Sequence, residues 1–182
     1  MNRRTLLAAV AAGTTGTVGG ARWLADDAAA TTIGLQVDGD ETTVTDADAI
    51  DAVRLDIDTE WSYELAETAS PDTVTVEIAA GREGELTTVA DAESAQLFTE
   101  ADGAESFEVD LLATDALDAD ALVPDEGTRT TTVVVEATME VTDGGDVLAS
   151  ESVRTEATIT VTVPDVPDAE ISGDGELTIE TA

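Results

Sequence analysis

The chain has 182 residues and carries 41 acidic against 7 basic side chains, giving a formal net charge of −34. It contains no His, Lys or Cys, which excludes disulfides, thiolate metal sites and the commonest general base. Nucleic acid is not expected as a partner, because this charge repels a polyanion. The acids alternate with apolar residues, and 42% of the chain is hydrophobic. This pattern indicates a folded protein with an acidic surface rather than a disordered acidic tail.

Residues 1–30 differ from the rest of the chain and predict an export signal. Arg3 and Arg4 precede an apolar stretch that runs to Ala21, and no acid occurs before Asp26. The paired arginines resemble a twin-arginine signal, which implies the twin-arginine export machinery as a partner and an extracellular or cell-surface location. Cleavage after Ala30 and retention as an uncleaved anchor both stay open, and contact with a membrane is expected only in the second case.

Residues 31–168 predict one β-domain, because apolar and polar residues alternate with period two. The clearest run spans residues 53–65, where every odd position is apolar, aromatic or Thr and every even position is charged or Ser. One face of such a strand packs on a core and the other meets solvent. Trp61 and Tyr63 lie on the apolar face, so we expect them in the core.

Residues 129–163 predict a long antiparallel hairpin. Two alternating runs flank Asp143-Gly144-Gly145-Asp146, whose glycines suit a tight turn. Two Ala- and Asp-rich stretches, residues 90–98 and 114–122, predict short helical connections. Pro164 and Pro167 end the last strand, because proline has no N–H to donate to a sheet. Residues 169–182 then predict a small hairpin or an extended arm.

The predicted fold is therefore all-β, a single antiparallel β-sandwich with one or two short helical connections after the N-terminal signal. Seven or eight strands separated by turns are typical of this class. The composition resembles that of exported proteins of halophilic archaea, and the body resembles immunoglobulin-like sandwiches. Both resemblances hold at the level of class, with no specific family. Neither implies a functional residue.

Clustered carboxylates are the candidate metal ligands. Asp143 and Asp146, which flank the hairpin turn, are the pair that we select, although the sequence supports them only weakly. Calcium takes six to eight oxygen ligands, and acids in loops can supply them. In a chain this acidic, however, such clusters also arise by chance. No segment has the spacing of a calcium-binding loop, and no catalytic or cofactor-binding residue is predicted. Other loop acids are found in three groups: Asp38, Asp40 and Glu41; Asp115, Asp118 and Asp120; Asp165 and Asp168.

The sequence thus predicts a secreted or cell-surface, non-enzymatic β-sandwich protein with a structural or binding role and no cofactor. Its partners would be further copies of itself or other cell-surface proteins. One alternative is a subunit of an extracellular filament or surface assembly, joined through a terminal strand such as residues 32–37 or the C-terminal tail. Another is a small calcium- or carbohydrate-binding module or a hydrolase.

Overall fold

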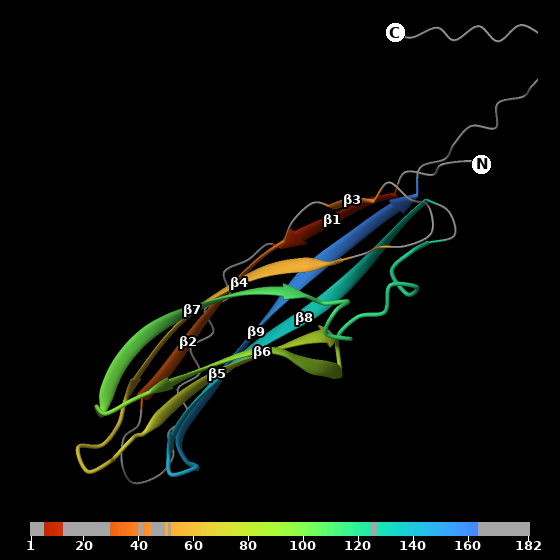
Figure 1. Ribbon diagram of the computed structural model, residues 1–182. Coiled ribbons are helices and arrows are strands. Elements are labelled where there is room, and N and C mark those ends of the chain that lie inside the picture. The colour runs from red at the N-terminus through yellow and green to blue at the C-terminus, as the bar shows by residue number, and fades with distance from the viewer. Residues whose placement is uncertain are drawn as a thin grey trace, which may run out of the picture.

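A computed structural model describes residues 6–12, 30–39, 42–44, 50, 52–124 and 127–163 of the protein (Figure 1). Within these ranges the chain forms strands joined by turns and loops, and no helix occurs. The strands are β1 (Leu6–Ala12), β2 (Ala30–Gly39), β3 (Thr42–Val44), β4 (Arg54–Glu64), β5 (Thr73–Arg82), β6 (Glu85–Ala95), β7 (Glu100–Asp110), β8 (Gly127–Asp143) and β9 (Asp146–Val163).

The strands form two antiparallel sheets. The larger has the order β3-β1-β9-β8-β5-β6, and the smaller has the order β2-β4-β7. Within the predicted signal segment, β1 pairs with β9 and with the short strand β3. Figure 1 shows β1 and β3 beside the end of β9, beyond the smaller sheet. The predicted C-terminal arm, residues 169–182, lies outside the described residues.

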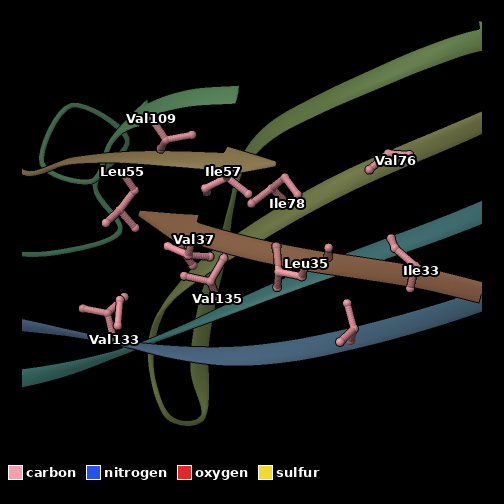
Figure 2. Packing of buried hydrophobic residues seen from close by; sticks show 14 of the residues in the cluster. Ile33, Leu35, Val37, Leu55, Ile57, Val76, Ile78, Val109, Val133 and Val135 are labelled. Atoms are coloured by element: carbon pink, nitrogen blue, oxygen red, sulfur yellow. The ribbon is translucent and has the colours of Figure 1, made fainter. Parts of the chain in front are cut away.

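One apolar core joins the two sheets, as the alternation predicts. In β4 every odd residue from Leu55 to Tyr63 is buried and every even residue is exposed. Figure 2 shows Val37 and Leu35 of β2 pointing toward Val135 of β8, so side chains of both sheets meet in the same layer. The all-β prediction and the core positions of Trp61 and Tyr63 are therefore confirmed.

The predicted hairpin is also confirmed, because β8 and β9 pair from Gly127↔Val163 to Asp143↔Asp146. Gly144 and Gly145 form the two-residue turn with φ angles of 58° and 92°. Turns with both central residues at positive φ match the right-handed twist of a hairpin, and glycine adopts them without steric cost.

The two predicted helices are wrong. Residues 85–95 form β6, in which Ala90 and Ala92 pair with Ile78 and Val76 of β5. Alanine favours a helix only weakly, and long-range pairing overrides that preference. Residues 114–122 lie in a series of turns, with Leu111, Leu117 and Leu122 buried against the core. The Arg129 guanidinium donates to the carbonyls of Ala121 and Val123 and holds this excursion against β8.

Trp61 occupies space that a missing side chain leaves free. Gly103 of β7 is directly opposite Trp61 of β4, and a Cβ atom at Gly103 would lie 2.4 Å from Trp61 Cζ2. The ring also stacks on Tyr63, with centroids 6.2 Å apart and planes inclined by 8°. The indole Nε1 is buried without a hydrogen-bond partner, so Trp61 contributes through packing alone.

We predict that Gly103→Ala lowers the free energy of unfolding by about 1–3 kcal/mol, because the added methyl overlaps a confined indole ring. Gly34→Ala is the matched control. Gly34 also faces β4 from a neighbouring strand, but its Cβ would meet nothing closer than the Glu60 carbonyl oxygen at 3.7 Å. Chemical denaturation of both variants in high salt measures the difference. Equal stability of the two variants would contradict this account of Gly103.

Candidate functional site

The predicted metal candidates lie at the β8–β9 turn, where Asp143 and Asp146 form the closing pair. Both side chains are exposed. Among the described residues, no three His, Cys, Asp or Glu side chains are grouped as a metal site needs. Asp118 accepts a hydrogen bond from the Asp120 amide, and Asp38 accepts one from the Gln36 side chain. Asp40, Glu41, Asp165 and Asp168 lie outside the described residues.

A different carboxylate, Asp72, organises this end of the molecule. Its Oδ2 accepts a hydrogen bond from the Gly144 amide at 2.8 Å, and its Oδ1 accepts one from the Thr142 hydroxyl at 3.3 Å. Its amide donates to the Thr142 carbonyl, and its carbonyl accepts from the Gln96 amide, both at 2.8 Å. Asp72 thus connects the β4–β5 loop, the β8–β9 turn and the β6–β7 crossing, which is the segment between Ala95 and Glu100 that leads from the larger sheet to the smaller one.

These contacts shift the acidity of Asp72. The hydrogen bond from the Gly144 amide, aided by that from Thr142, holds the pKa of the Asp72 carboxyl below its ordinary value. The folded chain therefore binds a proton at this position more weakly than the unfolded chain does. The resulting stabilisation is present above the unfolded-state pKa and is lost as the pH falls through the folded-state pKa.

The outer face of the smaller sheet carries carboxylates directly opposite one another. Asp56 of β4 faces Asp38 of β2 on one side and Glu108 of β7 on the other. Glu64 and Glu100 form a second like-charged pair. Like charges in opposite positions on neighbouring strands destabilise a sheet. In molar salt the Debye length falls to about 3 Å, and this repulsion is largely screened.

Two stretches of uncovered sheet edge among the described strands carry a glutamate on their core-facing side: the edge strand β7, and the part of β9 next to the turn, with which β1 does not pair. Glu151 of β9 lies between the buried residues Ala149 and Val153 and is only 8% exposed. Glu105 of β7 is opposite Thr59, which is 1% exposed. A charge that points inward from an edge strand discourages another strand from adding there, because pairing would bury the charge further. Both glutamates interrupt the apolar positions of a period-two pattern, and this interruption is the sequence signal that could identify them.

Two further surface features lie away from these edge glutamates. Leu97 and Phe98, in the β6–β7 crossing, are 84% and 70% exposed, although the Phe98 carbonyl accepts a hydrogen bond from the Tyr63 hydroxyl at 2.9 Å. A shallow groove near the β5–β6 turn is lined by Glu136 and Arg154, which form an ion pair. That ion pair raises the pKa of Arg154. The cation among the residues that line the groove is therefore already paired with a carboxylate.

We predict that Asp72→Asn lowers stability at neutral pH, because the amide side chain lacks the charge that strengthens the bonds from Gly144 and Thr142. The stability difference from the wild type should shrink as acid protonates Asp72. Thermal unfolding measured at several acidic pH values follows this difference. Asp143→Asn, a neighbouring exposed carboxylate, is the control and should show a smaller effect. A constant Asp72 difference at all pH values would contradict the linkage.

We also predict that Asp56→Thr raises the free energy of unfolding in dilute salt by roughly 0.2–1 kcal/mol, because it removes one charge and with it two like-charge pairs, to Asp38 and to Glu108. The gain should fade in multimolar salt, where screening already removes the repulsion. Arg54→Thr, on the same face of β4, is the matched control and should lower stability at low salt. Denaturation at a series of salt concentrations checks both signs. A salt-independent gain for Asp56→Thr would point to side-chain propensity instead.

The comparisons with known proteins add no relative. No family model, no curated protein and no solved structure matches the chain. The described residues include no helix with the length and apolarity that crossing a bilayer requires.

Proposed function

We propose that this chain is a secreted or cell-surface, non-enzymatic β-sandwich protein that works in brine and has a structural or binding role. The observation that carries the proposal is the row Asp38–Asp56–Glu108, in which three carboxylates face one another across three strands. Such a row is costly in dilute buffer and tolerable in concentrated salt. The net charge of −34 extends the same argument to the whole surface.

We infer that the sandwich belongs to the immunoglobulin-like class. Without β1 and β3, seven strands remain, and we count them in chain order. The smaller sheet holds the first, second and fifth of them, which are β2, β4 and β7. The larger sheet holds the fourth, third, sixth and seventh in that order, which are β6, β5, β8 and β9. The immunoglobulin constant-type fold places the fourth strand beside the fifth, in the first sheet. Here β6, the fourth, pairs with β5 instead. The order is otherwise the same, and this supports the class without transferring any functional residue.

The N-terminal segment supports an extracellular location. Arg3 and Arg4 before an apolar stretch fit a twin-arginine signal, which serves proteins that cross the membrane already folded. Folding inside the cell suits a chain without cysteines, which has no disulfides to form outside. In the precursor Leu6–Ala12 pairs with β9, so release of β1 from this edge would precede recognition of the signal.

A non-enzymatic role follows from residue chemistry. The chain contains no His, Lys or Cys to act as base or nucleophile. The acids on the outward face of the smaller sheet recur with the two-residue period of the strands, and two of them, Glu60 and Asp102, also line an open hollow beside Trp61. A subunit of a surface assembly is the second candidate, favoured by one observation: the edge of β9 already pairs with a strand from outside residues 31–163.

We predict that Arg3→Lys combined with Arg4→Lys stops export from a halophilic host, because lysine is not the residue that the twin-arginine signal presents. Arg22→Lys, later in the same segment, is the control and should be exported normally. Immunoblots of cells and medium give the location, and mass spectrometry gives the N-terminus. Wild-type protein that stays in the cytoplasm with residues 1–30 attached would overturn the extracellular proposal. Export of the double variant at the wild-type level would overturn only the twin-arginine route.

A further inference from the structure

The outer edge of β9 is divided into two chemically different parts. Next to the turn, Glu151 faces the core between Ala149 and Val153. A strand added beside it would enclose this carboxylate further, so Glu151 discourages pairing there. Toward the C-terminal end, the core-facing residues are Ala157, Ile159 and Val161, which are at most 1% exposed. This second part carries no charge on its core-facing side.

The structure shows that the second part can accept a strand. Backbone pairs join Leu7–Ala12 of β1 to Ala157–Thr162 of β9 in antiparallel register. No other described strand pairs with this side of β9. Removal of residues 1–30, by cleavage of the proposed export signal, would take β1 away and leave the backbone donors and acceptors of six residues at an apolar edge.

We propose that, in the mature protein, the edge Ala157–Thr162 accepts residues 176–181 from the C-terminal segment of a second copy. The inference rests on the proposed function, because export must first remove β1. Strand addition of this kind takes its affinity from main-chain hydrogen bonds and its specificity from alternate side chains.

The donor sequence fits this edge in an antiparallel register that pairs residue 176 with residue 162. Leu177 would lie opposite Val161, Ile179 opposite Ile159 and Thr181 opposite Ala157, so that both apolar donors meet the core side. The opposite face would pair Glu176 with Thr162, Thr178 with Thr160 and Glu180 with Thr158. Both glutamates therefore meet threonines and no acid. A shift by one residue would turn Leu177 and Ile179 to solvent.

The sequence after β9 favours donation to another copy over a return to the same edge. Val163 ends β9, and Pro164 and Pro167 follow directly. These two prolines favour extended backbone here, because proline fixes its own φ and disfavours the helical region for the residue before it. Such a spacer would carry the tail away along the axis of β9 before Gly173 and Gly175. A tail donated by each copy and accepted by the next is a head-to-tail contact, which builds a ring or an open filament.

Disulfide trapping tests the proposal cleanly, because the natural chain has no cysteine. Thr160→Cys and Thr178→Cys are introduced on separate copies of the exported protein, whose N-terminus is first checked by mass spectrometry. The two are mixed in multimolar salt under mild oxidation. We expect a cross-linked dimer from this mixture. Ser152→Cys, beside Glu151 and exposed, is the matched control for Thr160→Cys and should give at least tenfold less dimer.

A second variant separates assembly from folding. Ile179→Asp should abolish the cross-link, because it would place a charge opposite Ile159, while Glu180→Gln should leave the cross-link unchanged. Circular dichroism verifies that each variant is folded. Light scattering after size-exclusion chromatography of the cysteine-free mature chain should show oligomers that Ile179→Asp converts to monomers.

The failures are distinguishable. If the wild-type protein stays in the cytoplasm with residues 1–30 attached, the proposed function fails; if it is exported with them attached, only the strand-addition proposal fails, because β1 keeps the edge occupied. If the chain is exported and trimmed, three results would overturn only the strand-addition proposal: no cross-link, equal cross-linking of the Ser152→Cys control, or an intrachain disulfide in a monomer carrying both Thr160→Cys and Thr178→Cys. The last result would show that the tail folds on its own edge.

Discussion

Burial of one face of every principal strand against a shared apolar layer is the constraint on which this structure depends. The buried apolar side chains of each sheet lie on the face that meets the other sheet, so neither sheet satisfies its hydrophobic surface without the other. The requirement fixes the register of every strand, because a slip of one residue would exchange the core face of β4 for its charged face. It also places the acids: once the odd positions of β4 are inside, the charges Asp56, Asp58 and Glu60 must all point outward together.

The acidic surface is therefore a consequence of the fold as much as of composition. Neighbouring strands bring outward residues directly opposite each other, so an acid at every second position inevitably produces like-charged rows such as Asp38–Asp56–Glu108. Screening by salt weakens the repulsion within the sheet as well as the repulsion between molecules. At the edges the same charge has a second use, because Glu105 and Glu151 occupy core-facing positions where aggregation would otherwise begin.

The sequence was sufficient for features that depend on local pattern. The alternation of residues 53–65 located β4 and the burial of Trp61, and the glycine pair at 144–145 located the hairpin. It was insufficient for β6, because Ala- and Asp-rich residues suit a helix locally and only pairing with β5 makes them a strand. Asp72 was missed as the organising carboxylate because its partners Thr142 and Gly144 lie 70 and 72 residues away. The sequence indicates Asp143 and Asp146 instead, which flank the same turn. The acceptor edge of β9 depends on sheet order, which periodicity does not contain.

If residues 1–30 are removed, the packing of Trp61 makes this residue an internal optical reporter. The chain has two tryptophans, and the other one, Trp23, lies in the segment that export would remove. The remaining indole is 5% exposed, stacks on Tyr63 and makes no hydrogen bond through Nε1. Its emission should therefore be that of an indole in a dry, apolar environment and should shift to longer wavelength only when the two sheets separate. Fluorescence from one residue would thus follow the integrity of the core during changes of salt, without a label.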